Sequence, residues 1–246
     1  MKTTIFKGIS LVMTFLLFYS CNKDETSGDN IGADSSSDFE ILSADIDLVG
    51  KDEVKAVYSD PSLDSLYQLS EPGEDQVWDF SNLPASPDHY DTLPWLDPAS
   101  LALSDTFPQA DLASYDGSSF SVFKLTSDKM EVVGHYDSVN QRETIMDDPL
   151  TILTFPVRQG GSFRDEGKVE LEPGYYMTQI RDVVYDASGE LILPSGSYDC
   201  VRAKIMDITT YDTSYAYDYI SKSLGMPVMT IDVNKNDSIE RVKYLN

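Results

Sequence analysis

The chain has 246 residues, of which 41% are hydrophobic and 11% aromatic. That is enough apolar material for a packed core, and it excludes an intrinsically disordered acidic protein. The formal charge of −24 at pH 7 excludes nucleic-acid binding, which depends on neutralising phosphates with Lys and Arg. It also disfavours contact with anionic lipid, whereas divalent cations and basic partners would be attracted. The simplest interpretation of the charge is a solvated acidic surface.

Residues 1–20 have the order of features found in a bacterial lipoprotein signal peptide. Lys2 and Lys7 supply positive charge, and residues 9–18 form an apolar run that is too short to span a bilayer. Ser20 followed by Cys21 resembles the lipobox of bacterial lipoproteins, in which the cysteine receives lipid and the peptidase cuts just before it. The alternative is a short N-terminal anchor helix with an incidental cysteine.

Residues 21–37 are predicted to form a flexible tether that begins with a sorting signal. Lys23, Asp24 and Glu25 resemble the surface-export signal of Bacteroidetes-type lipoproteins. That resemblance implies an outer-membrane lipoprotein exposed at the cell surface, with attachment facing the periplasm as the alternative. The membrane would be contacted through the lipid on Cys21, since stable anchoring needs at least two acyl chains and lipoprotein cysteines of this family usually carry three.

Residues 38–246 are predicted to form a single domain that is rich in β-structure. Short helical turns are expected only at 60–70 and 98–104. The segment from Gln76 to Leu83, with Trp78 and Phe80 in a Trp-Asp-Phe-Ser sequence, resembles a segment of secreted Bacteroidetes-type β proteins. The resemblance implies a β-rich extracellular or surface domain and carries over no catalytic residue. Physically, Trp78 and Phe80 are expected to anchor the core.

The segment from Leu83 to Pro108 is proline-rich and is predicted to be an ordered surface loop. His89, Tyr90 and Trp95 lie in it and are the candidate ligand-binding residues, because exposed aromatic rings serve as stacking platforms for sugars. The alternative for Trp95 is that its side chain folds back and caps the core.

The rest of the chain shows the alternation typical of half-buried strands, as in residues 130–136, 201–205 and 229–233. Residues 186–198 resemble a hairpin of the same β proteins, with Gly189 and Gly196 expected to supply turn geometry. Cys200 is expected to be a buried structural cysteine, since lipidation of Cys21 leaves it no disulfide partner. Many short strands separated by turn signals predict an all-β fold: an antiparallel, jelly-roll-like β-sandwich with few or no helices.

Motifs for chemistry are scarce. Sequences typical of serine hydrolases, phosphate-binding loops, dinucleotide sites and zinc sites are missing. His89 with its flanking aspartates, joined by His135, is a candidate set of metal ligands. The simpler interpretation is a polar loop with a surface histidine, and no metal or other cofactor is predicted. Structural calcium remains open because aspartates crowd several turns. The pairs concerned are Asp45 with Asp47, Asp147 with Asp148, and Asp232 with Asp237.

These observations favour a non-enzymatic, lipid-anchored surface protein that binds an extracellular glycan or protein, or serves as an accessory subunit. A structural or adhesive envelope protein is the second hypothesis, and it predicts a large apolar face or an unpaired strand edge. A polysaccharide-active hydrolase is the third, and it requires a cleft with two converging carboxylates.

Overall fold

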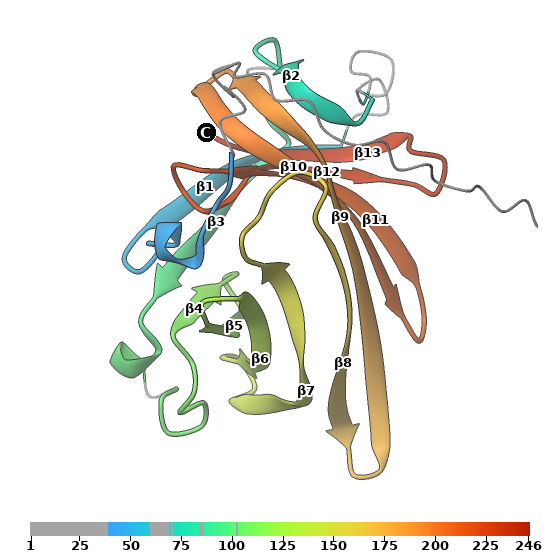
Figure 1. Ribbon diagram of the computed structural model, residues 1–246. Coiled ribbons are helices and arrows are strands. Elements are labelled where there is room, and N and C mark those ends of the chain that lie inside the picture. Colours follow the sequence, from blue (N-terminus) through green and yellow to red (C-terminus); the bar gives the residue numbers. More distant parts are fainter. Residues whose placement is uncertain (1–38, 60–68, 70, 84–85, 102) are drawn as a thin grey trace, which may run out of the picture. The chain divides into compact units, whose positions relative to one another are not determined.

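The computed structural model describes residues 39–59, 69, 71–83, 86–101 and 103–246 (Figure 1). The predicted signal peptide, Cys21, the export signal at Lys23, Asp24 and Glu25, and the tether all lie outside these residues. The described elements are η1 (Ser43–Asp45), β1 (Asp52–Tyr58), β2 (Gly73–Asp79), β3 (His89–Leu96), η2 (Pro98–Ser100), β4 (Leu112–Tyr115), β5 (Ser119–Leu125), β6 (Lys129–Asp137), β7 (Arg142–Thr154), β8 (Ser162–Glu172), β9 (Tyr175–Leu193), β10 (Gly196–Thr209), β11 (Thr213–Ser221), β12 (Met226–Val233) and β13 (Ile239–Leu245).

The strands form one continuous sheet that closes on itself. Its order is β10-β11-β12-β13-β1-β3-β4-β5-β6-β7-β8-β9, and β9 pairs with β10 to complete the ring. In the part of the chain that is described, this is a closed antiparallel barrel of 12 strands. The prediction of an all-β fold is therefore confirmed, and the prediction of a β-sandwich is wrong.

Two features of the strands explain why the sheet closes. β9 and β10 are 19 and 14 residues long, beyond the usual length of sandwich strands, and long tilted strands are what a barrel needs. In addition, the inward-facing positions include charged side chains such as Glu53 and Arg181, which pair with other groups inside the ring instead of filling a flat apolar interface. A sandwich core would exclude them.

β2 lies outside the ring and pairs in parallel with β9 (Figure 1). Trp78 and Phe80 are 3% and 4% exposed and contact the ring of Tyr219, so the prediction that they anchor the core is confirmed. Gly189 lies within β9, and a Cβ there would overlap the backbone of Gln76. The prediction that Gly189 supplies turn geometry is thus wrong, because its role is to let β2 approach β9.

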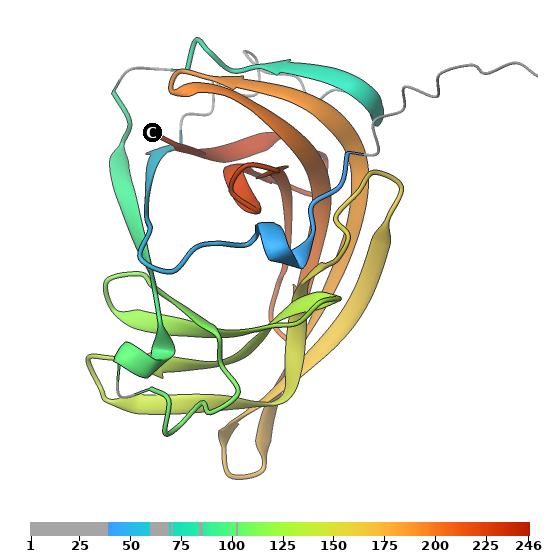
Figure 2. The same cartoon turned by 60° about the vertical axis from the view of Figure 1, so that its left-hand side comes forward.

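The N-terminal part of the described domain runs across the opening of the ring (Figure 2). Ile41 forms a β-bridge with Val157 and belongs to a cluster with Tyr185 and Ile220. Leu48 belongs to a second cluster, which also contains Trp95, Phe123 and Met226. These two clusters fill part of the barrel interior, and a cavity remains between β5–β7 and β8–β9.

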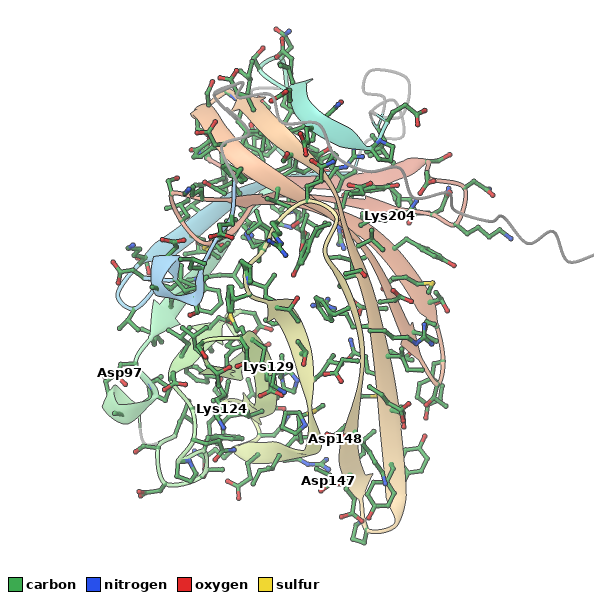
Figure 3. All side chains as sticks on the ribbon, in the orientation of Figure 1. Asp97, Lys124, Lys129, Asp147, Asp148 and Lys204 are labelled. Atoms are coloured by element: carbon green, nitrogen blue, oxygen red, sulfur yellow. The ribbon has the colours of Figure 1, made fainter. Side chains whose placement is uncertain are left out.

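The proline-rich segment is not a continuous loop, because His89–Leu96 forms β3 and pairs with β1. Pro94 is tolerated in β3 because it is the last residue of β3 in the pairing with β1. The pairing of β3 with β4 begins at the next residue, Trp95. Pro98–Ser100 forms η2, in agreement with the helical turn expected at 98–104, whereas residues 60–68 and 70 lie outside the described part. Asp97 caps η2 by accepting the backbone N–H of Ala99 (Figure 3).

Cys200 is fully buried in the cluster beneath β2, which confirms its predicted structural role. Burial raises the pKa of its thiol far above the ordinary value. No helix among the described residues has the length and apolar character needed to cross a bilayer.

Candidate functional site

The barrel contains a cavity of about 500 Å³ between β5, β6 and β7 on one side and β8 and β9 on the other. Most of its wall is apolar. The apolar side chains are Phe123, Val132, Met146, Leu150, Ile152, Val169, Leu171 and Met177. Polar groups interrupt this wall at four positions, which are His135, Thr144, Gln179 and Arg181. A concave apolar site of this size with a few polar groups is the usual form of a small-molecule pocket.

Strand alternation explains how these residues come to face the cavity. On β9, Met177, Gln179 and Arg181 share one face, and the residues between them point outward. On β6 the alternation is shifted by a bulge between Val132 and Gly134, opposite Val122 and Phe123 of β5, so that Val132 and His135 both face the interior. The cavity therefore follows from the pleat of the sheet together with this bulge.

A second pocket, of about 580 Å³, adjoins the first and forms its mouth. The two pockets share His135, Thr144 and Leu171. The mouth adds Ser119, Asp137, Arg142 and Tyr175, of which only Tyr175 presents a large apolar surface. The inner pocket is thus mostly apolar, with Gln179 and Arg181 on its β9 side, and the mouth is mostly polar.

His135 lies at the junction of the two pockets. Its Nδ1 is 3.3 Å from the hydroxyl oxygen of Ser121 on the neighbouring strand β5. Burial lowers the pKa of His135, and the negative charge of Asp116 opposes this shift only in part. The imidazole is consequently neutral at pH 7 and offers one donor and one acceptor.

Arg181 is a cation in the cavity wall that is already neutralised. Its Nε and Nη2 donate to the two carboxylate oxygens of Asp207 at 2.8 and 2.7 Å. The two residues are directly opposite on β9 and β10, so the sheet register holds this bidentate pair in place. Arg181 therefore contributes hydrogen-bonding atoms to the cavity without a net positive charge.

The structure does not gather the residues that the sequence suggested for ligand binding. Trp95 is only 8% exposed: its ring contacts Phe123, and its indole N–H donates to Glu53. The alternative, that Trp95 folds into the core, is the one observed. Tyr90 is 52% exposed, but it points away from the face that carries His89 and Trp95.

The metal hypotheses gain no support from the geometry. The imidazole of His89 lies 3.3 Å from a carboxylate oxygen of Asp91, but His135 is on β6, separated from β3 by β4 and β5. Across the described ranges, His, Cys, Asp and Glu side chains form no group of three or more that could hold a metal ion. Two of the aspartates considered for calcium have basic partners instead, because Asp232 pairs with Arg241 and Asp237 with Lys204.

The mouth of the cavity was not predicted from the sequence. Tyr175 and Tyr176 directly follow the turn at residues 172–174, and they are 47% and 45% exposed. Two tyrosines directly after a hairpin turn indicate exposed aromatic rings, so these two residues could have been predicted from the sequence. By contrast, the convergence of β5, β7 and β9 on one cavity depends on strand pairing that no local pattern shows.

Comparisons with known proteins leave the chain without a family. No protein-family model matches it, and no curated protein matches it. Among solved structures, a chain from Bacteroides fragilis NCTC 9343, described as an exported protein with a YmcC-like fold, aligns with a TM-score of 0.30 and 10% identity. The alignment covers 81% of this chain and 95% of that one. A similarity at this level supports no conclusion about fold or function.

Proposed function

We propose that this protein is a non-enzymatic binding protein whose barrel cavity holds a small, largely apolar ligand. The observation that carries the proposal is the cavity of about 500 Å³, in which an apolar wall surrounds four inward-facing polar groups. Barrels of this size are known to enclose ligand cavities, and their rigid walls orient polar groups before the ligand arrives.

The cellular setting of this activity is part of the same proposal. We place the protein at the outer membrane, exported and anchored by lipid on Cys21, with Lys23, Asp24 and Glu25 directing it to the cell surface. The support is the order of features in residues 1–25. The ligand would then be met outside the cell or in the envelope, where it is free or attached to another molecule.

The chemistry of the wall favours binding over catalysis. Among the described residues that line the two pockets, Asp137 is the one carboxylate, whereas hydrolysis of a glycosidic bond requires two. His135 faces Ser121 through Nδ1, but the nearby carboxylate of Asp116 accepts hydrogen bonds from Ser118 and Ser119 instead of orienting the imidazole. Neither the single carboxylate of Asp137 nor the contact between Ser121 and His135 therefore supplies an activated nucleophile.

Blocking the cavity tests the proposal. Thr144 faces both pockets, and its neighbour Ile145 is 48% exposed on the other face of the same strand. N-phenyl-1-naphthylamine, an uncharged dye that fluoresces in apolar surroundings, is expected to bind the native protein. Thr144→Trp fills the cavity and should weaken dye binding by about tenfold or more, whereas Ile145→Trp should leave it unchanged.

Thermal unfolding of both variants controls for loss of structure. If the dye fails to bind the native protein, or if it binds equally well to a folded Thr144→Trp variant, the cavity is not the binding site.

A further inference from the structure

The cavity has a polarity gradient, and this gradient constrains what kind of molecule fits. Away from the mouth, Phe123, Val132, Leu150 and Ile152 form an apolar wall on the β5–β7 side. Gln179 and Arg181 interrupt the opposite wall on β9, but Arg181 is already paired with Asp207. A ligand that extends from the inner end to the entrance is therefore expected to be mostly apolar at one end and polar at the other. This inference rests on the proposed function and concerns the class of ligand.

The charges around the site are matched within the protein. Arg181 is paired with Asp207. At the mouth, Asp137 accepts hydrogen bonds from the turn around Asn140, including its side-chain amide at 2.7 Å. Arg142 lies opposite Asp137 in the β6–β7 register and donates to the backbone carbonyl of Leu171. Asp137 and Arg142 lie opposite each other at the mouth, so a head group of either charge would meet a residue of the same charge beside the one of opposite charge, and would lose hydration on entry.

The mouth nevertheless offers many neutral hydrogen-bonding groups. They are the hydroxyls of Ser119, Thr144 and Tyr175 and the imidazole of His135. Ser119 already donates to Asp116, and the hydroxyl of Tyr175 contacts that of Tyr211, but their oxygens can still accept. Groups of this kind suit a head that carries several hydroxyls, which can donate to them. The charge of −24 on the whole chain adds a second restriction, since it repels anions from the surface.

Tyr175 adds an aromatic face at the entrance. It is 47% exposed, it lines the mouth, and its hydroxyl contacts that of Tyr211 from the β10–β11 turn. An exposed tyrosine ring presents an apolar surface with a polar tip, which suits contact with a sugar ring. Tyr176 is exposed to a similar extent, but it belongs to the other face of β9, where its ring contacts Lys168 at 4.0 Å.

We infer that the ligand is an uncharged amphiphile, with an aliphatic chain in the apolar end of the cavity and a hydroxyl-rich, sugar-like head between Tyr175 and the polar groups of the mouth. The expectation of glycan recognition thus moves from Trp95 and Tyr90 on β3 to the entrance of the barrel, and it becomes recognition of a lipid-linked sugar rather than of a free polysaccharide.

A series of amphiphiles with straight alkyl tails of seven or eight carbons tests this inference. The protein is the chain from residue 22 onward, made without acyl groups, which would themselves compete for the cavity. It retains every described contact, since these begin at residue 39. The compounds are octyl glucoside, octanol, octanoate and octylammonium, each titrated by calorimetry below its micelle-forming concentration.

Octyl glucoside should bind about tenfold more tightly than octanol, and octanol more tightly than either charged compound. Tyr175→Ala should remove the advantage of octyl glucoside over octanol, and Tyr175→Phe should retain most of it. Tyr176→Ala is the matched control and should have no effect. Both tyrosines are exposed, so thermal unfolding midpoints should stay close to that of the native protein.

The inference is overturned if octanoate or octylammonium binds as tightly as octyl glucoside, or if Tyr176→Ala acts like Tyr175→Ala. Such a result leaves the proposed function standing as long as N-phenyl-1-naphthylamine still binds and Thr144→Trp still blocks it. Failure of the dye and of all four compounds to bind would overturn both.

Discussion

Arg202 is a charged side chain inside an otherwise apolar cluster, and Asp186 compensates its charge. The guanidinium is 1% exposed, and its Nε and Nη2 donate to the carboxylate of Asp186 at 2.8 and 3.0 Å. It also lies against the rings of Trp78 and Tyr217. The pair therefore links β9 and β10 to the aromatic cluster that holds β2.

Removing the carboxylate should be costly, because it leaves a buried cation without its counter-ion. Asp186→Ala is expected to lower the free energy of unfolding by about 3–5 kcal/mol. Asp182→Ala is the control, since Asp182 pairs with the half-exposed Arg164 and its loss should cost less than about 1 kcal/mol. Urea unfolding of both variants measures the difference, and equal effects would contradict this account of Arg202.

At the scale of the strand, Gly189 determines whether β2 can join the sheet. A Cβ at this position would overlap the backbone of Gln76, and backbone atoms cannot move aside as a side-chain tip can. β2 has no hydrogen-bonded strand neighbour other than β9 among the described elements, so it has nowhere else to pair. The close approach of β2 to β9 at Gly189 is thus needed for Trp78 and Phe80 to be buried.

Gly189→Ala should displace β2 and expose the aromatic cluster to solvent. Gly196→Ala is the matched control, because Gly196 has a similar positive φ of 145° but open space around its Cβ position. We expect Gly189→Ala to be less stable than Gly196→Ala by about 1–3 kcal/mol in urea unfolding. Faster limited proteolysis between residues 71 and 83 should accompany it, and equal stabilities of the two variants would show that the backbone contact is unimportant.

The sequence identified individual strands better than their partners. Alternation revealed the strands at 201–205 and 229–233, and the apolar character of Trp78 and Phe80 revealed two core positions, because these signals are local. It did not reveal β3, since proline density outweighed the alternation of residues 89–96. Nor did it reveal the cavity: Phe123 and Arg181 line one pocket only because four successive strand pairings, from β5–β6 to β8–β9, curve within the closed ring.

At the scale of the whole molecule, the excess of 42 acidic over 18 basic residues sets how stability depends on pH and salt. Repulsion among carboxylates at pH 7 favours expansion of the chain. Burial also raises the pKa of Asp218 above its ordinary value, so protonation of that group on acidification adds stability. Both effects place the pH of greatest stability on the acidic side of neutrality.

A group of turn aspartates opposes this trend at lower pH. Hydrogen bonds from the backbone N–H groups of Ser119 and Ser118 lower the pKa of Asp116 to about 2. The pKa of Asp137 is also lowered, first by its hydrogen bonds with Asn140. A carboxylate whose pKa is depressed by folding stabilises the folded state. This contribution is complete above the carboxylate's pKa in the unfolded chain, near 4, and is lost as the pH falls toward its pKa in the folded protein.

The urea midpoint is therefore expected to rise from pH 7 to about pH 5 and to fall below about pH 4. Added sodium chloride should raise the midpoint at pH 7 by screening the repulsion, and should do so less at pH 5. A midpoint that is highest at pH 7 or above, or that does not respond to salt, would show that net charge does not limit stability.

The pairing of β1 with β13 joins the two ends of the described domain, with Lys55 opposite Leu245. Because of this pairing, the ring stays open until the last strand has been delivered. A chain that crosses a membrane from its N-terminus onward would keep one unpaired strand edge on β1 and another on the strand that emerged last, until β13 arrives. The order of the strands thus prevents the ring from closing early, and the barrel can finish folding only when β13 has emerged.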